Sequence, residues 1–243
     1  MTHEEGRARR QTGLAPPTFR GPSLTAKTVE GKALRLGGAL PPHLGQVRQS
    51  RISRQVARSM GAIALETAKA IEFLRTLRTV RRFTDQPVPQ AVLDDLLTVA
   101  RWSGSANNRQ PWVFVIVRDR YTLRRLSELQ GYVRHLAGAA LAIVLVMDGN
   151  PDQVEQETFD EGVLSQRLQL AAEAHGLGSA IGWFHSEGRQ TAKDLLGIPP
   201  ERLVRTALSF GYEDVGAEDA RSHPPQARKP LAEIVHNERF GAA

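Results

Sequence analysis

Apolar residues recur along residues 60–243 with two alternating periods. Helical spacing is typical of about 64–77, where Ile71, Leu74 and Leu77 share one face, and of about 89–102, which has proline near its start. Continuous apolar runs predict buried strands over 112–117 and 140–147. Helices are also expected over about 121–129, 158–175 and 189–197, and strands over 179–184 and 202–212. This alternation predicts an α+β or α/β domain with a mixed sheet.

The first quarter of the chain differs from the rest. Residues 1–59 are rich in Arg, Gly, Pro, Ser and Gln and have 11 Lys and Arg against 3 Asp and Glu, a charge of +8 within the total of +6. The remainder is therefore slightly acidic, at −2. We predict that 1–59 are a disordered basic extension and that 60–243 are the folded domain. Met60 as the true start, or a tail that binds acidic partners, are alternative interpretations.

Composition excludes several kinds of chemistry. The 243 residues contain no cysteine, which rules out disulfides, thiolate nucleophiles and iron–sulfur clusters. No apolar run is long enough to span a bilayer, and the N-terminus has no signal-peptide core. We therefore expect a cytoplasmic protein without a membrane partner.

Two familiar signatures fail on inspection. The segment GLGSAIG, 176–182, follows a helix and precedes a strand, whereas a dinucleotide-binding loop needs the reverse order. The seven histidines show no H-x-x-x-H spacing, and we interpret His175 and His185 as surface or cap residues, so no metal site is predicted. Trp112 and Phe184 are interpreted as packing residues. No side chain stands out as a catalytic acid or base.

Two polar segments carry the candidate chemistry. In LRTVRRFTDQPVP, Arg78 and Arg81 flank Thr79 at a helix end, a grouping that suits a phosphate or another anionic oxygen group. In SGSANNRQPW, 103–112, adjacent amides stand at the mouth of a buried strand. Amide side chains offer both donors and acceptors to a heterocycle or sugar. Taken singly, a solvated basic face and a loop of Asx turns explain these two segments better than a binding site does.

Together the segments resemble the nitroreductase family of FMN-dependent oxidoreductases. RTVRRF and the following PVP are similar to that family's first motif, and SGSANNRQPW resembles its second at Ser105, Asn108, Gln110, Pro111 and Trp112. GLG after a long helix, DLLGIPP before a strand that ends in GY, and RKPLAEIVH at 228–236 follow in the family's order. The resemblance covers about 70–240. It implies an α+β fold, an α/β/α sandwich with a mixed, mainly antiparallel sheet and a domain-swapped tail from about 214.

The resemblance also implies roles for individual residues. Arg78, Thr79 and Arg81 would hold the FMN phosphate and ribityl chain, and Arg228 would close on the phosphate. Ser105 and Asn108, with Gln110 of the same motif, would contact the flavin from the partner subunit. The backbone near Gly182 and Trp183 would face the flavin N5. An arginine also suits the N1–O2 edge of the flavin, which gains negative charge on reduction.

The implied activity is a ping-pong transfer of a hydride from NAD(P)H through flavin N5 to a small acceptor, such as a nitroaromatic or a quinone, in a homodimer with FMN at the subunit interface. Leu77, Gly104 and Gln226 depart from the family pattern and leave the FMN affinity open. The short segment between the strand at 140–147 and the helix near 158 leaves little room for a lid.

Two alternatives remain at this stage. One is a flavoenzyme of the same fold with different chemistry, namely flavin cleavage, dehalogenation, or peptide or heterocycle oxidation. The short lid disfavours dehalogenation. The other is a nucleic-acid-associated protein that uses the basic tail, which the acidic folded part disfavours.

Overall fold

The computed structural model describes residues 65–218 and 228–241. The predicted basic extension at 1–59, Met60 and Gln226 lie outside these residues. Within them, a helix over 65–76 precedes α2 (Gln90–Arg101) and the 3-10 turn η1 (Ala106–Asn108). The order then runs β1 (Trp112–Val117), α3 (Arg120–Ser127), η2 (Arg134–Gly138), β2 (Leu141–Met147), η3 (Pro151–Gln153), α4 (Val154–Ala174), β3 (Gly178–Trp183), α5 (Ser186–Leu196), β4 (Leu203–Gly211) and α6 (Leu231–Ile234).

The four strands form one antiparallel sheet in the order β1-β2-β4-β3. The two central strands, β2 and β4, are the most buried, and every residue of β2 is buried. A single parallel bridge joins Thr79 to Ser179 at the outer edge of β3. The sheet is therefore mixed and mainly antiparallel, and the predicted α+β class is confirmed.

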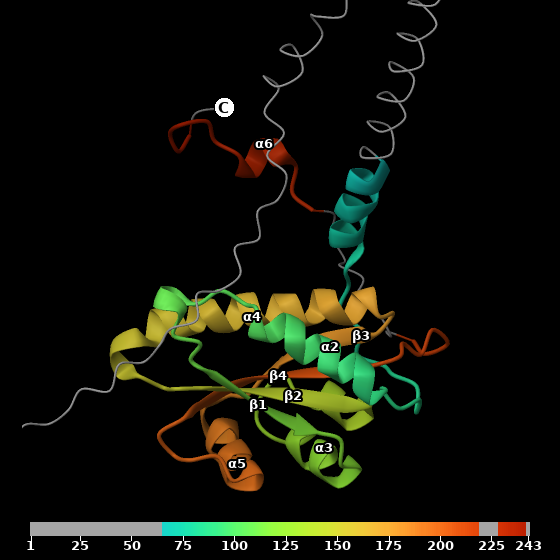
Figure 1. The fold of residues 1–243 in the computed structure, drawn as a ribbon, viewed down its shortest axis with the longest axis vertical. Helices are drawn as coiled ribbons and strands as arrows, with labels where there is room; N and C mark the ends of the chain where they lie inside the picture. The colour runs from blue at the N-terminus through green and yellow to red at the C-terminus, as the bar shows by residue number, and fades with distance from the viewer. Residues whose placement is uncertain (1–64, 219–227, 242–243) are drawn as a thin grey trace, which may run out of the picture. The chain divides into compact units, whose positions relative to one another are not determined.

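Helices cover both faces of this sheet (Figure 1). On one face α2 and α4 pack their leucines against residues such as Ile143 and Leu208. On the other face α3 and α5 enclose the second cluster, which includes Phe184 at 0% exposure. The predicted α/β/α sandwich is confirmed, and Phe184 is a core residue as interpreted. Trp112 packs at the border of the first cluster.

The main boundary that sequence patterning misplaced is the start of α4. The helix begins at Val154, whereas the pattern indicated about 158. Glu155 and Glu157 lie in its first turn, where the helix dipole favours negative charge. Glu157 also accepts hydrogen bonds from the backbone N–H groups of Gly149 and Asn150, at 2.9 and 3.2 Å. The connection from β2 to α4 is consequently shorter than predicted.

The histidine interpretations agree with the helix ends. His175 is the C-cap of α4 and His185 is the N-cap of α5. Gly176 and Gly197 follow α4 and α5 with φ of 70° and 64°. Glycine adopts this left-handed backbone without a steric penalty, which explains why both helices end there.

The contact between the 79–80 segment and β3 predicts an asymmetric response to two glycine replacements. In Gly178→Ala, the new Cβ would lie 2.6 Å from Val80 Cβ, so we expect a loss of about 1–3 kcal/mol in unfolding free energy through overpacking. Gly162→Ala is the matched control, because its Cβ meets nothing within 4 Å and alanine favours the interior of α4. Urea denaturation measures both. Equal stability of the two variants would show that the 79–80 segment does not pack on β3.

Candidate functional site

The outer edge of β3 is paired at two points and open between them. Val80 N–H donates to Ser179 O at 2.9 Å, and Tyr132 N–H donates to Trp183 O at 2.8 Å. In an antiparallel pair, backbone groups point alternately toward and away from the neighbouring strand. The backbone N–H and C=O groups of Ser179 and Trp183 point away from β4, so those of Ile181, which lies between them, do so as well. Among the described residues no backbone hydrogen bond reaches its outward N–H or C=O.

A cavity of about 520 Å³ lies at this opening. Its walls come from three segments that are far apart in the sequence: the run after the first helix, residues 131–135 at the start of η2, and β3. The lining residues are Arg81, Gly131, Tyr132, Arg134, His135 and Ile181. The cavity thus combines an apolar strand edge, free backbone groups and two guanidinium groups.

His135, which lines this cavity, is neutral near pH 7 because of its surroundings. Its Nε2 is 3.2 Å from Tyr132 O, which can only accept, so Nε2 carries the hydrogen. Its Nδ1 therefore accepts from the Ser209 hydroxyl at 2.7 Å. Burial lowers the pKa of His135, the hydrogen bond to Tyr132 raises it and the charge of Arg81 lowers it, and together they bring the pKa to about 4. The imidazole is a fixed hydrogen-bonding support rather than a charge.

The residues around the opening explain the glycine at 182. A Cβ on Gly182 would meet Ala207 O at 3.0 Å and His135 Nε2 at 3.1 Å. The strand can therefore lie on the 132–135 segment only where no side chain intervenes. The absence of a side chain at Gly182 lets β3 pack closely against His135, while the backbone N–H and C=O of Ile181 point outward.

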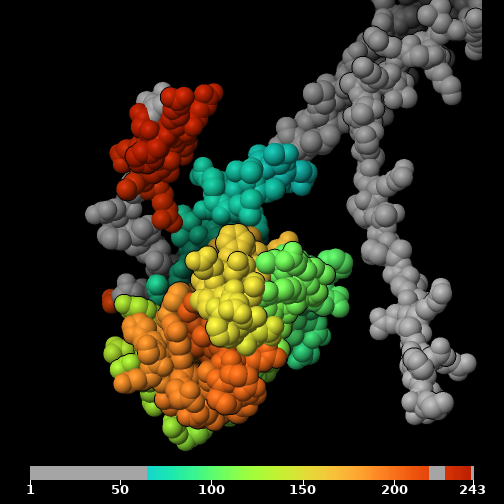
Figure 2. All heavy atoms as spheres, turned by 90° about the vertical axis from the view of Figure 1, so that its left-hand side faces the viewer, coloured from blue at the N-terminus to red at the C-terminus, as the bar shows by residue number. Residues whose placement is uncertain are grey.

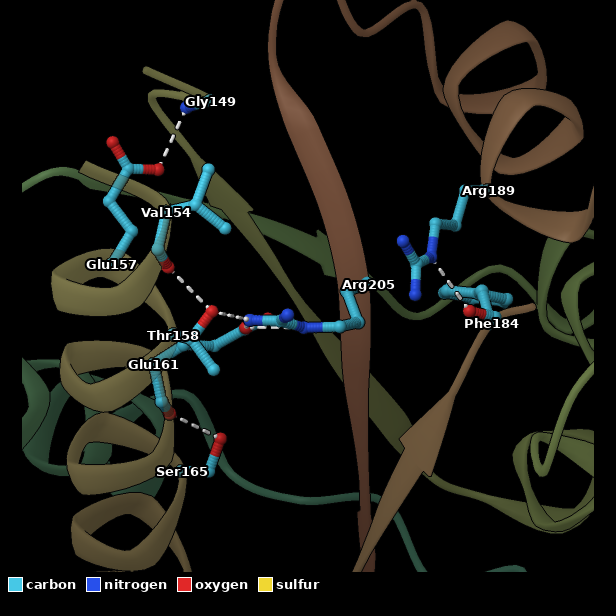
Figure 3. Close-up of polar contacts among 9 residues, drawn as sticks. All are labelled: Gly149, Val154, Glu157, Thr158, Glu161, Ser165, Phe184, Arg189 and Arg205. Atoms are coloured by element: carbon cyan, nitrogen blue, oxygen red, sulfur yellow. Dashed lines mark hydrogen bonds and ion pairs between the residues drawn. The ribbon is translucent and has the colours of Figure 1, made fainter. Parts of the chain in front are cut away.

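Trp183 is supported by a charged network inside the domain. Arg205 lies 5.2 Å from the indole and donates from Nε to Glu161 Oε2 at 2.8 Å and from Nη2 to Thr158 at 3.1 Å. Figure 3 shows Arg205 reaching from β4 to α4. The register of β4 against β2 advances three residues, from Val204 to Ala207, while β2 advances two, from Val146 to Val144. This bulge allows Arg205 to turn toward α4.

The first predicted motif is only partly gathered at the cavity. Arg81 lines it. Thr79 forms the bridge to Ser179, and Arg78 Nη1 donates to Arg75 O and Leu77 O, both at 2.8 Å, at the end of the first helix. Arg228 is exposed and follows the undescribed residues 219–227. Its predicted phosphate contact stays a prediction.

The second predicted motif forms a tightly bonded turn. Gln110 N–H donates to Ser105 Oγ at 2.9 Å, and its side-chain amide lies 3.3 Å from Asn108 Oδ1. Asn107, Asn108 and Gln110 have φ between 51° and 54°, a left-handed backbone that costs energy for residues other than glycine. Such a conformation persists because surrounding bonds hold it.

This turn borders a second cavity, of about 630 Å³. The walls are Gly104, Ser105 and Ala106 on one side and the first turns of α4 on the other, with Glu155, Gln156, Phe159, Asp160 and Val163. Figure 2 shows the yellow start of α4 beside the green segment that follows α2. Asp160 is 4% exposed, and its Oδ2 accepts from Ala106 N–H at 3.3 Å. Phe159 is 72% exposed beside it.

The structure therefore divides the predicted site into two surfaces. Arg81 lies at the first cavity with Gly182 and Trp183 on the adjoining strand, and Ser105 lies at the second with Asn108 and Gln110 in the same turn. The two cavities have no lining residue in common. That the second motif acts on a partner subunit stays a prediction.

Sequence reasoning missed Tyr132, Arg134 and His135. Their segment lies between the helix expected over about 121–129 and the strand expected over 140–147, where no element or motif was predicted. The described residues contain no group of histidine and acidic side chains that could hold a metal ion. None of the described helices has the length and apolar character needed to cross a bilayer.

Comparison of the chain with known proteins identifies the family to which it belongs. The model of the nitroreductase family matches residues 74–131. A protein of Archaeoglobus fulgidus, named for NADH dehydrogenase and NAD(P)H nitroreductase activity, is 30% identical over 169 residues, which cover 66% of this chain and 97% of that one. The chain belongs to the nitroreductase family, and it is an oxidoreductase.

Two further relatives extend the comparison. An FMN-dependent nitroreductase of Clostridium difficile has a similar structure, with a TM-score of 0.59, 25% identity, and coverage of 70% of this chain and 99% of that one. An NADPH-flavin oxidoreductase of Vibrio harveyi is 26% identical over 70% of this chain and 74% of its own.

The turn at the second cavity generates a test of Asp160. In Asp160→Ala the Ala106 N–H loses its acceptor, and the strained turn opens more often. A lost buried hydrogen bond costs about 1–3 kcal/mol, so we expect tryptic cleavage after Arg109 to be about tenfold faster. Mass spectrometry of timed digests measures the rate.

Asp160→Asn is the control, because it keeps an acceptor oxygen in the same place. We expect its cleavage rate to stay within about twofold of the wild-type rate. If Asp160→Ala were cut no faster than Asp160→Asn, Asp160 would not hold the turn.

Proposed function

We propose that the chain binds FMN at the open edge of β3 and uses NAD(P)H to reduce a small acceptor, such as a nitroaromatic or a quinone, by a ping-pong reaction. The observation that carries this proposal is the outward backbone of Ile181 beside Arg81. The names of the relatives support it, since they include an FMN-dependent nitroreductase and an NADPH-flavin oxidoreductase.

The residues at the cavity fit an isoalloxazine ring. One edge of that ring has acceptor atoms and one N–H donor. The backbone N–H of Ile181 could donate to an acceptor on that edge, and its C=O could accept from the N–H. Arg81 lines the same cavity, so it would supply a positive charge for the N1–O2 edge in place of the phosphate contact that the resemblance implies. A cavity of about 520 Å³ falls within the range of small-molecule sites. FMN, when bound, would accept a hydride from the nicotinamide and pass it to the acceptor.

The chain's own residues would position the reactants. Neutral His135 would hold its segment on the sheet through its hydrogen bond with Ser209. Arg205 would fix the position of Trp183 beside the opening by its contact with the indole ring. Thr79 and Arg78 lie at the entrance segment, where the resemblance assigns the phosphate and ribityl chain. None of these roles needs a side chain that transfers a proton.

The second cavity supports a homodimer with the flavin at the subunit interface. Ser105 and Asn108 lie on a different surface from Arg81, so they would reach the flavin of the other subunit. The second cavity is lined by the acidic residues Glu155 and Asp160, and the first is lined by arginines, so the two surfaces have complementary charges. The described part of the C-terminal arm exposes Leu231, Ile234 and Phe240, as a segment that packs on a partner would. A cytoplasmic location is part of the same proposal.

A flavin titration tests the proposal and the role of Arg81. We expect the wild-type protein to quench FMN fluorescence on binding, and bound FMN to lose its visible absorbance when NADH or NADPH is added without oxygen. Arg81→Gln removes a charged hydrogen bond, so FMN should bind about ten- to a hundredfold more weakly.

Arg82→Gln is the matched control, since Arg82 has the same charge and borders none of the described cavities. Its affinity for FMN should remain close to that of the wild-type protein. A wild-type protein that takes up no FMN would refute the flavin proposal. Equal losses in the two variants would refute the role of Arg81.

A further inference from the structure

Arg134 lies where two cavities adjoin. It begins η2 and lines both the 520 Å³ cavity at Ile181 and a neighbouring cavity of about 620 Å³, and Gly131 is also common to both. Its side chain is exposed, and no ion pair involves it among the described residues. The guanidinium is therefore available at the mouth of the candidate site.

The first cavity has a positive charge without a compensating carboxylate. Arg81 and Arg134 are its charged lining residues, and no acidic side chain lines it. His135 adds no charge near neutral pH, because its imidazole stays unprotonated. A cavity of this kind attracts an anionic group, and the planar fork of arginine suits a carboxylate with two parallel hydrogen bonds.

The other walls favour a flat, apolar body over an extended polyanion. Tyr132 is 74% exposed and packs its ring edge-on against His185 at 5.3 Å, and Ile181 is 42% exposed. These side chains offer apolar surface beside the guanidinium. In the neighbouring cavity, Glu128 is a lining residue and would repel a chain of phosphates.

We propose that Arg134, which stands where the cavity beside Ile181 meets its neighbour, binds the carboxylate of an aromatic acid that lies next to the flavin, and so sets the class of the acceptor. The inference rests on the proposed function, because a flavin held by Ile181 and Arg81 leaves Arg134 for the second ligand. The acceptor is then an aromatic compound with a carboxylate on the side away from the group that is reduced.

Binding of benzoate and benzamide tests this assignment without turnover. The two molecules have similar shape and differ in charge, so calorimetric titration of each compares the anion with its neutral counterpart. With FMN-loaded wild-type protein we expect benzoate to bind about tenfold more tightly than benzamide, with a preference that weakens as salt is added. In Arg134→Gln the preference should disappear while benzamide binding stays unchanged.

Arg124→Gln is the matched control. Arg124 is exposed on α3 and borders none of the described cavities, so this variant should keep the tenfold preference. Circular dichroism confirms that each variant is folded. Equal binding of benzoate by wild type and Arg134→Gln would overturn the proposal, as would benzamide binding as tightly as benzoate or an absence of benzoate binding to wild type.

The result is separable from the flavin proposal. If the protein takes up no FMN, the same titrations are made on the protein alone, where a loss of benzoate binding in Arg134→Gln still supports an anion site. If FMN binds and the benzoate preference is absent, the flavin proposal stands and the assignment of Arg134 fails.

Discussion

The candidate site depends on how the edge of one strand is paired. β3 would be an ordinary edge strand, with a row of free backbone groups open to any extended chain. Val80 closes it at Ser179 and Tyr132 closes it at Trp183, and between them no backbone group of the residues described covers Ile181. Gly178 and Gly182 make this possible, because each lies too close to a neighbouring segment for a side chain. The opening is thus bounded by backbone hydrogen bonds rather than by a flexible loop.

The long helix α4 organises what surrounds that edge through buried acidic side chains. Glu157, Asp160 and Glu161 are each less than 5% exposed, and each has a partner on a different element. Glu157 binds the backbone that leaves β2, Asp160 binds the turn after α2, and Glu161 binds Arg205 of β4. Burying a carboxylate is costly unless its hydrogen bonds are made. These three contacts therefore fix the helix against both loops and sheet, and they explain why three carboxylates are buried in a helix start that is otherwise mostly exposed.

The elements with strong periodicity were predictable from sequence. β1 matches its predicted bounds, and the helix ends at Gly176 and Gly197 follow from glycine's left-handed backbone. The start of α4 was misplaced because its stabilising groups are carboxylates, which look like solvent-exposed residues in a sequence. The cavity lining from Tyr132 to His135 was missed for a related reason. Its significance comes from packing against β3, a contact between segments about fifty residues apart. In contrast, Arg81 and Ser105 could be nominated early, although only the fold shows that they lie on separate surfaces.

The central claim is that two chains complete one flavin site, with Arg81 from one and the 105–110 turn from the other. Two differently tagged chains test it, one with Arg81→Gln and one with Asn108→Ala, co-expressed and purified through both tags as the heterodimer. Each parent homodimer lacks one half of every site, while the heterodimer has one intact site by symmetry. The measurement is the tightly bound FMN per dimer. The account predicts about one in the heterodimer and almost none in either parent. A heterodimer that binds FMN as weakly as both parents would show that Arg81 and Asn108 serve the same site from the same chain.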